Sequence, residues 1–512
     1  MIRLRLAASL LLLSGLLGAA EAQYFGKNKV QYKDFDWRII KTEHFEVFHY
    51  ETEKEAALDA ARMAERSYSR LSRVLGYDMV RPIPLILYAS HSDFQQTNIT
   101  TTLVGEGTGG LTEFLKRRVV VPFTGSYAEL EHVLTHEMVH AFQVEILFGS
   151  SGSVLANTLG FSPPLWFMEG MCEYLSTPEV DRHTEMWLRD AALQGYLIPI
   201  EVLSRVSDIR VYRFGQSIFE FLGEKYGDEK IGEILRAAPR VGGVSQAFQS
   251  VLGISLEKFS DEWLEEIRRT YLPQIADYVK PEKIARAITD SKEDLSNMNL
   301  VPAVSPSGER VVFASDRAMY SDMYLADTKD GKIIGKLVEG ERTGSFESLR
   351  FFRTSISWSP DERFVAFPAK VGAEDAIYVY NVERRRVQRR LTFGFDGMLS
   401  PSWSPDAEHL VFVALEGGRS NLFTCRSDGE ELTRLTGDRF ASLHPAWSPD
   451  GKTIAFTTDR GGETDFERLV FGNFRIALLD LATGEVSVLP NMEGKNIAPQ
   501  WSPDGKELLF VS

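Results

Sequence analysis

The sequence predicts a multidomain protein, with an N-terminal α+β domain followed by an all-β domain. In the first half, runs with strand periodicity precede long segments in which apolar residues recur at helical spacing. In the second half, a short motif recurs among strand-like runs, and 512 residues are too many for one hydrophobic core. We expect a signal peptide at 1–22, the α+β domain at 23–275, a polar linker at 276–297 and the repeats at 298–512.

The composition narrows the class of protein. With 44% hydrophobic and 25% charged residues, the chain resembles ordinary folded proteins. A formal net charge of -15 argues against a nucleic-acid partner, which would bind a basic face. Cys172 and Cys425 are too few for a disulfide scaffold. We expect two free buried thiols, although an exported protein could pair them.

The N-terminus has the pattern of a secretory signal. Arg3 and Arg5 form a basic start, an apolar run covers 6–17, and Ala20-Glu21-Ala22 is a small-residue cleavage site. The alternative is an uncleaved anchor, for which the run is short. No later segment is long and apolar enough to cross a membrane. We therefore expect an exported bacterial protein, periplasmic or secreted, that begins near Gln23.

The α+β domain is predicted to begin with strands. Alternation over 38–50 indicates a strand, apolar spacing over 52–75 a helix, and the run at 83–88 a second strand. Residues 118–121 follow as a short strand, which is either an ordinary sheet member or an edge strand that could pair with an extended substrate. The glycine-rich stretch at 105–110 lacks the lysine of a phosphate loop and is expected to form a mobile turn rather than a nucleotide site.

The motif of greatest chemical interest is His136-Glu137-Met138-Val139-His140. It lies in a predicted helix over 127–148, and residues four apart share one helical face, so both histidines can bind one metal ion. Glu137 is placed to take a proton from a metal-bound water. The flanks are apolar, and burying unpartnered polar groups there would be costly, which favours a metal over an exposed polar face. Further helices are predicted at 165–176, 183–195, 211–225, 228–237 and 256–270.

Catalytic zinc needs a third protein ligand, and Glu169 is the candidate, because it lies in an apolar helix. Glu173, one turn later, could accept a hydrogen bond from a ligand histidine or could face solvent. Tyr212 is a candidate donor to a developing oxyanion, or else a packed aromatic residue. His132 precedes His136 by one turn and is expected to lie outside the ligand set, since one ion cannot readily bind histidines that span two turns.

The HExxH pattern followed by Trp166-Phe167-Met168-Glu169-Gly170 resembles the gluzincin metallopeptidases, and most closely the bacterial "peptidase MA-like" domains. The resemblance implies that His136, His140 and Glu169 bind one Zn²⁺ and that Glu137 is the general base. It also implies that Glu173 supports a histidine ligand from behind. The chain departs from the best-known relatives in the 28 residues that separate His140 from Glu169, which leaves the shape of the cleft open.

The repeats carry Trp-Ser-Pro-Asp at Trp358, Trp403, Trp447 and Trp501, with a weaker copy around Val304. Spacings of 44 to 54 residues filled with short strands are typical of one four-stranded propeller blade per repeat. The repeats resemble the TolB propeller, which implies that tryptophan packs between blades and that Ser-Pro-Asp forms a turn. The last copy ends after one or two strands and predicts an incomplete blade.

Together these features predict an exported zinc metallopeptidase that hydrolyses peptide bonds, with a propeller that binds substrate or a cell-envelope protein. The alternative is a non-catalytic envelope binding or scaffold protein with a structural or vestigial metal site. The intact general base at Glu137 argues against that alternative, because a purely structural site has no use for it. Propeller repeats identify a fold and not a reaction.

Overall fold

The computed structural model describes residues 29–149, 161–177, 181–290, 296–340 and 346–512. The predicted signal peptide at 1–22 lies outside the described residues, as does part of the predicted linker. Within the described ranges, no helix combines the length and the apolar character that a membrane span requires.

A five-stranded mixed sheet opens the chain, in the order β1-β2-β3-β5-β4. Its strands are β1 (Arg38–Lys41), β2 (Phe45–His49), β3 (Ile83–Tyr88), β4 (Leu111–Glu113) and β5 (Arg118–Pro122). The central strands β2, β3 and β5 run parallel, and both outer strands are antiparallel to their neighbours. The prediction of a single strand at 38–50 is wrong in one respect, because the structure has two strands there. A turn after Lys41 folds β1 back onto β2.

The outer strand beside the HExxH helix is β4, so the interpretation of residues 118–121 as an edge strand is wrong. β5 is an interior strand, paired with β3 on one side and β4 on the other. Residues 111–113 were not predicted to be a strand, because three residues after a run of glycines give no usable periodicity. Among the described strands, β4 pairs with β5 alone.

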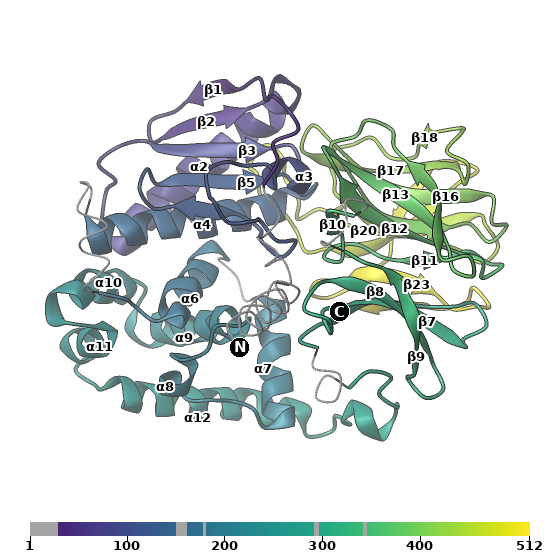
Figure 1. The fold of residues 1–512 in the computed structure, drawn as a ribbon. Coiled ribbons are helices and arrows are strands. Elements are labelled where there is room, and N and C mark those ends of the chain that lie inside the picture. Colours follow the sequence, from purple (N-terminus) through teal and green to yellow (C-terminus); the bar gives the residue numbers. More distant parts are fainter. Residues whose placement is uncertain (1–28, 150–160, 178–180, 291–295, 341–345) are drawn as a thin grey trace, which may run out of the picture.

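Two long helices cover one face of this sheet, as Figure 1 shows: α2 (Lys54–Leu75) and α4 (Tyr127–Phe148). Ser126 caps α4, because its hydroxyl accepts a hydrogen bond from the backbone N–H of Glu129. Phe45 and Val47 of β2 are buried toward these helices, while Phe48 packs on the opposite face of the sheet, as the alternation predicted. The sheet therefore gives α4 a rigid support.

The rest of the first half is helical. Its elements are the short α3 (His91–Phe94), then α6 (Leu165–Ser176), α7 (Arg182–Gln194), α8 (Ile200–Leu203), α9 (Arg210–Tyr226), α10 (Glu229–Val241), α11 (Val244–Leu252) and α12 (Leu256–Ile275). The five helices predicted from apolar spacing are confirmed, with ends shifted by a few residues. The short helices α3, α8 and α11 were missed, since elements of four to nine residues give little periodic signal.

Helices α6 and α9 cross at two glycines. A Cβ atom on Gly170 would lie 2.4 Å from the backbone carbon of Gly215, and one on Gly215 would lie 2.7 Å from the carbonyl oxygen of Trp166. No side chain fits at either position, so the backbones approach each other directly. This contact holds Glu169, the neighbour of Gly170, against α4.

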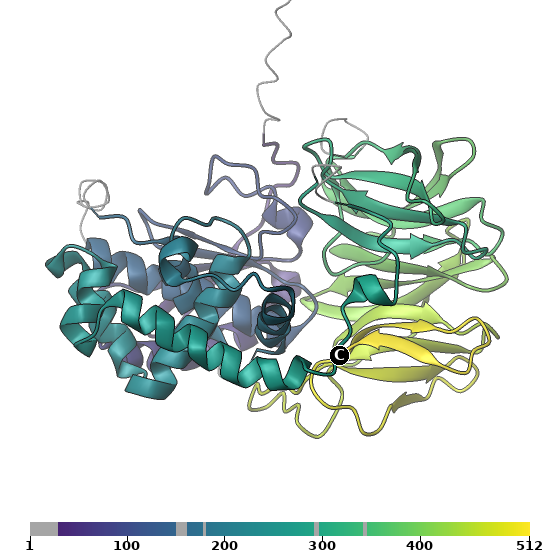
Figure 2. The same cartoon turned by 90° about the horizontal axis from the view of Figure 1, so that it is seen from below.

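The second half is a set of antiparallel sheets arranged as propeller blades (Figures 1 and 2). The first blade has β6 (Asn299–Val304), β7 (Arg310–Ser315), β8 (Asp322–Asp327) and β9 (Ile333–Val338). The second has β10 (Ser348–Leu349), β11 (Ser357–Trp358), β12 (Phe364–Val371), β13 (Glu374–Asn381) and β14 (Arg386–Leu391). The third blade has β15 (Gly397–Trp403), β16 (His409–Glu416), β17 (Arg419–Arg426) and β18 (Thr433–Arg434). The fourth blade has β19 (Ser442–Trp447), β20 (Thr453–Thr458), β21 (Arg475–Asp480) and β22 (Val486–Val488). The last sheet is two-stranded, with β23 (Ile497–Trp501) and β24 (Leu508–Val511).

The repeated residues act in the structure as the motif predicted. The indole of Trp358 donates to the carbonyl of Ala303 in the preceding blade at 2.8 Å, and Trp501 donates likewise to Ala446 at 3.2 Å. In each full copy the serine hydroxyl donates to the aspartate of the same turn, as Ser359 does to Asp361 at 2.6 Å. The motif therefore links neighbouring blades through the indoles of Trp358 and Trp501, and each full copy closes the turn before the strand that follows it.

Both cysteines are buried and free, as predicted.

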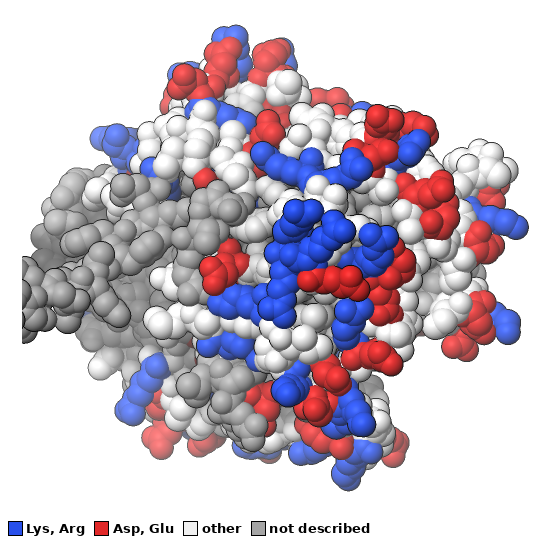
Figure 3. Space-filling view, turned by 45° about the vertical axis from the view of Figure 1, so that its right-hand side comes forward, with Lys and Arg blue, Asp and Glu red and all other residues white. Residues whose placement is uncertain are grey.

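On the side of the molecule that Figure 3 turns forward, which includes the propeller, Lys and Arg side chains gather in one group. Strand β14 is the outer strand of its blade and carries exposed arginines at 386, 389 and 390. Charged side chains on an outer strand disfavour pairing with the strand of another molecule.

The two halves lie side by side and are in direct contact (Figures 1 and 2). Leu469, from a propeller loop, is buried in the hydrophobic core of the first half, and Phe471 of the same loop stacks on Tyr127 at the start of α4. Ser420 of β17 donates to the carbonyl of Gly125 at 2.8 Å. The propeller thus packs directly against the start of the helix that carries HExxH.

Candidate metal centre

The two histidines of the HExxH motif converge on one carboxylate oxygen. Nε2 of His136 lies 3.3 Å and Nε2 of His140 lies 3.2 Å from Oε2 of Glu169. Helix α4 supplies the histidines on one face, and α6 packs across it and supplies the glutamate. All three side chains are largely buried. Two helices that are distant in sequence therefore bring both imidazole Nε2 atoms to one carboxylate oxygen.

Two of the three separations between these atoms can be compared with those around a zinc ion. Ligands bound tetrahedrally at about 2.0–2.1 Å lie about 3.3 Å from one another, and two imidazole nitrogens with one carboxylate form a common catalytic zinc set. The observed 3.3 and 3.2 Å match that separation. Three ligands from the protein would leave a fourth position for a water molecule or substrate.

Each ligand histidine is held from behind by a second partner. Nδ1 of His136 lies 3.0 Å from Oε1 of Glu173, and Nδ1 of His140 lies 2.9 Å from Oε1 of Gln143. The Gln143 amide donates in turn to the carbonyl of Met168 at 2.9 Å, which orients its oxygen toward His140. Such partners hold the proton on Nδ1 and leave Nε2 free for a metal.

Gln143 was not anticipated from the sequence. Its position three residues after His140, on the same helical face, was the available signal. Glu173 is also held by Arg213, whose Nη1 lies 3.1 Å from Glu173 Oε2 and 2.7 Å from Asp181 Oδ2. Arg213 was not anticipated either, because the contact joins helices that are not adjacent in sequence.

The electrostatics of the metal-free centre follow from this packing. Burial lowers the pKa of His136, but hydrogen bonds with Glu169 and Glu173 outweigh burial and raise that pKa to about 10. Burial raises the pKa of Glu169, yet its histidine contacts bring that pKa down to about 2, and Glu173 is lowered to about 2 in the same way. Without metal, a proton on His136 therefore balances the carboxylates, and binding of a dication would displace it.

Glu137, the predicted base, lies beside the ligand set and is buried. The hydroxyl of Thr112 on β4 lies 2.8 Å from Oε2 of Glu137 and 2.7 Å from its backbone carbonyl, so the single hydroxyl proton can serve either acceptor. A Cβ atom on Gly110 would lie 2.8 Å from Cγ of Glu137. The edge strand and the loop before it thus limit the orientations open to this carboxylate.

Tyr212 and His132 lie near the centre. The ring of Tyr212 lies nearly parallel to that of His136, with centroids 6.3 Å apart, and burial raises the pKa of its hydroxyl. Nδ1 of His132 lies 2.9 Å from the hydroxyl of Ser176, and its Nε2 lies 3.7 Å from Glu173. His132 therefore faces the back of the centre and not the point where the ligands converge.

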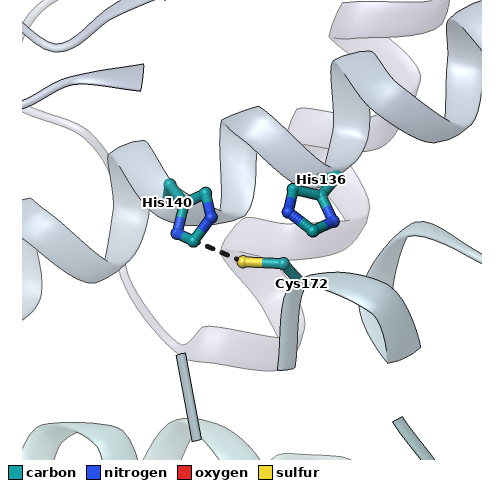
Figure 4. Close-up of side chains that lie close together, drawn as sticks. All are labelled: His136, His140 and Cys172. Carbon is teal, nitrogen blue, oxygen red and sulfur yellow. Dashed lines mark hydrogen bonds between the residues drawn. The ribbon is translucent and has the colours of Figure 1, made fainter. Parts of the chain in front are cut away.

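Cys172 offers a different third ligand, since its sulfur lies close to both histidines (Figure 4). The sulfur lies 3.4 Å from Nδ1 of His140, the nitrogen on the side of the ring away from Glu169. Burial raises the pKa of the Cys172 thiol well above its ordinary value when no metal is bound. The geometry favours Glu169.

The two candidate ligands can be separated by metal affinity. We expect Glu169→Gln to weaken zinc binding by roughly 100-fold or more, since supporting residues alone contribute about 10–100-fold. Cys172→Ser should weaken binding less than Glu169→Gln does, because Gln143 still holds Nδ1 of His140 and the serine hydroxyl keeps a polar group in place of the thiol. Competition with a chromogenic chelator measures both variants, and the opposite ranking would assign the metal to Cys172.

Part of the second half of the chain matches a known protein family. The family described as "TolB beta propeller domain" matches residues 338–472. The C-terminal half is therefore a TolB-like β-propeller, in agreement with its sheets and its tryptophan repeats.

Several curated proteins are similar to parts of the chain. "Uncharacterized protein Atu1656" of Agrobacterium fabrum is 28% identical over 30% of this chain and 53% of its own length. The Tol-Pal system protein TolB of Alkalilimnicola ehrlichii is 33% identical over 28% of this chain and 41% of its own length. "Uncharacterized peptidase YuxL" of Bacillus subtilis is 29% identical over 41% of this chain and 28% of its own length. The chain thus spans about half the length of the first of these relatives and less of the others.

Among solved structures, TolB from Acinetobacter baumannii aligns with 41% of this chain and 48% of its own, at 24% identity and a TM-score of 0.34. A putative TolB from Agrobacterium tumefaciens aligns with 42% of this chain and 75% of its own, at 21% identity and a TM-score of 0.33.

Proposed function

We propose that the protein is an exported zinc-dependent peptidase whose first half, residues 23–275, is a gluzincin-like catalytic domain. The observation that carries the proposal is the convergence of His136 and His140 on Glu169, with Glu137 buried beside them. A structural zinc site has four protein ligands and no need of a free carboxylate next to them. A centre with three ligands and an adjacent base has the composition of a hydrolytic site.

His136, His140 and Glu169 would hold the zinc ion, which when bound supplies a Lewis acid that polarises a carbonyl and acidifies water. Glu137 takes a proton from the attacking water and then delivers it to the leaving amine. Thr112 donates to the Glu137 carboxylate and holds it in place during both transfers. Tyr212 supplies a hydroxyl beside His136 that can donate to the developing oxyanion.

Strand β4 is the part of the sheet that an extended peptide would join. It is an outer strand, and its Thr112 contacts the base. An added peptide strand would be bound through backbone hydrogen bonds, and side-chain pockets would give specificity. A cavity of about 400 Å³ opens beside β4, lined chiefly by threonines and leucines, including Leu103, Thr108 and Leu111. Glu113 of β4 also lines this cavity, so a substrate side chain there would meet both apolar and acidic groups.

The propeller would bind substrate or a cell-envelope partner. A similarity to Tol-Pal proteins over less than half of each chain supports a place in the envelope, together with the leader-like start of the sequence. The rival function is an envelope binding or scaffold protein that holds a metal without hydrolysis.

Removal of metal tests the two functions. The full chain, loaded with zinc, is assayed on fluorescein-labelled casein and on a fluorogenic peptide library. We expect cleavage, its loss after dialysis against 1,10-phenanthroline, and its return on addition of stoichiometric zinc, because the ligand set has no other source of acidified water. Zinc content is measured in parallel. A protein that holds zinc and cleaves none of these peptides would refute the peptidase and favour the scaffold.

A further inference from the structure

The segment from Val104 to Glu113 touches both the predicted base and the propeller. At its C-terminal end, Gly110 packs against the side chain of Glu137, and Thr112 hydrogen-bonds the Glu137 carboxylate. At its N-terminal end, Gly107 lies against the ring of Phe352 in the propeller, where an added Cβ atom would come within 3.1 Å. We call residues 104–113 the bridging segment. It was predicted only as a turn, yet it spans the distance from propeller to base.

Arg350 of the propeller is the main anchor of this segment. Its side chain is 1% exposed and makes an ion pair with Glu106, which is 6% exposed. The same guanidinium binds Asp375 of β13 through Nε at 2.9 Å and Nη2 at 2.8 Å, and it donates to the hydroxyl of Ser92 at 2.6 Å. One propeller residue therefore joins its own blade, helix α3 and the bridging segment.

Helix α3 ties the segment down at a second point. Nη1 of Arg350 lies 3.0 Å from Nδ1 of His91, and Nε2 of His91 lies 3.1 Å from the carbonyl of Thr108. Since arginine can only donate, Nδ1 must accept and Nε2 must carry the proton that it donates to Thr108. Gln95 donates to the carbonyl of Val104 at 3.1 Å. Arg350 thus selects the tautomer of His91 that carries its proton on Nε2. That proton is donated to Thr108, two residues before Gly110, and holds the bridging segment there.

The charges make this anchor depend on the propeller. Burial raises the pKa of Glu106 to about 7 even though Arg350 opposes that shift, and burial keeps His91 neutral by lowering its pKa. Without Arg350, Glu106 and Asp375 would be buried carboxylates with no cation in direct contact. Loss of the guanidinium would also remove the ion pair to Glu106 and the donor to His91, so the bridging segment would lose its anchor and its hold on Glu137 would loosen.

We propose that Arg350 is a positioning residue for Glu137: the docked propeller holds the bridging segment in the conformation that orients the catalytic base. The expected effect on the rate of peptide cleavage rests on the proposed function. The contact between propeller, segment and Glu137 is a property of the fold. The propeller is then a required part of the active site, in addition to any role in binding partners.

Two measurements on the full chain test the inference, and only one of them needs a substrate. Carboxyl footprinting with a water-soluble carbodiimide and glycine ethyl ester reports how accessible Glu137 is. We expect Arg350→Ala to speed labelling of Glu137 and amide exchange in residues 104–113 by roughly tenfold or more. In casein and peptide assays, kcat should fall about tenfold with KM within about threefold, since the base and not the binding surface is displaced. Arg350→Lys should recover part of each effect.

The control is Arg439→Ala. Arg439 forms another ion pair between the halves, with Asp59 of α2, away from the bridging segment. It should leave exchange at 104–113 and labelling of Glu137 within about twofold of wild type. If the labelling rate of Glu137 in Arg350→Ala equals that of wild type, the inference is overturned, whatever the activity of the variant. The inference is also overturned if Arg439→Ala speeds the labelling of Glu137 as much as Arg350→Ala does. Absence of cleavage by wild type refutes the peptidase instead, and the footprinting result still decides the positioning of Glu137.

Discussion

Glu137→Gln should reduce peptide cleavage by about 10³-fold, within the range of about 10²–10⁴-fold that a positioned general base contributes. Glutamine has nearly the same shape and keeps the contacts with Thr112 and Gly110, but it cannot accept the proton of the attacking water. The ligand atoms of His136, His140 and Glu169 are untouched, so zinc content should equal that of wild type.

The matched control for this substitution is Glu131→Gln. Glu131 lies on the same helix and pairs with Arg66 at the surface of α2, away from the metal ligands. The Glu131→Gln variant makes the same chemical change at a surface ion pair, and its activity should stay within about twofold of wild type. Rates are measured with the zinc-loaded full chain on the best peptide of the library. Cleavage at the wild-type rate by Glu137→Gln would remove this residue from the mechanism.

Gly170→Ala should destabilise the N-terminal half by about 3 kcal/mol, at the upper end of typical overpacking effects. The new methyl group would lie 2.4–2.6 Å from backbone atoms of Gly215, and backbone cannot give way as a flexible side chain does. Helices α6 and α9 must separate, and because Glu169 adjoins Gly170, zinc affinity should fall as well.

Urea unfolding of the full chain, with and without zinc, measures this effect. Gly105→Ala is the control, because a Cβ atom there meets nothing within 4 Å and its backbone is not left-handed. That variant should lie within about 0.5 kcal/mol of wild type, as surface substitutions usually do. Equal stability of Gly170→Ala and wild type would show that the two helices pack less closely than the structure has them.

The periodic parts of the chain were predictable because each pattern reports a local regularity. Apolar spacing located α2, α4 and α12, and alternation correctly assigned Phe45 and Phe48 to opposite faces of the sheet. The tryptophan repeats predicted the propeller and the contact between its blades. Strand β4 was missed because three residues are too few to show a period. Whether residues 118–121 lie inside the sheet or at its edge was left open, because strand pairing depends on distant residues, and the structure places them inside.

The residues of the candidate centre likewise fall into those that the sequence predicted and those that it did not. His136, Glu137 and His140 share one helix, so their spacing in the chain is enough to bring them together. Glu169 and Glu173 were selected from an apolar helix, where a bare carboxylate would be costly. Gln143 and Thr112 hold the ligand and the base, yet nothing in their own sequence neighbourhood required it.

The sequence alone therefore determined that an α+β half precedes a propeller, that the HExxH residues share one helix, and how the repeats are built, since these depend on residues that are neighbours in the chain. Only the tertiary structure decided which carboxylate faces both Nε2 atoms, which strand borders the base, and that Arg350 of the propeller anchors the segment beside Glu137. The physical reason is that side-chain contacts between distant segments follow from packing, and packing leaves no period in the sequence.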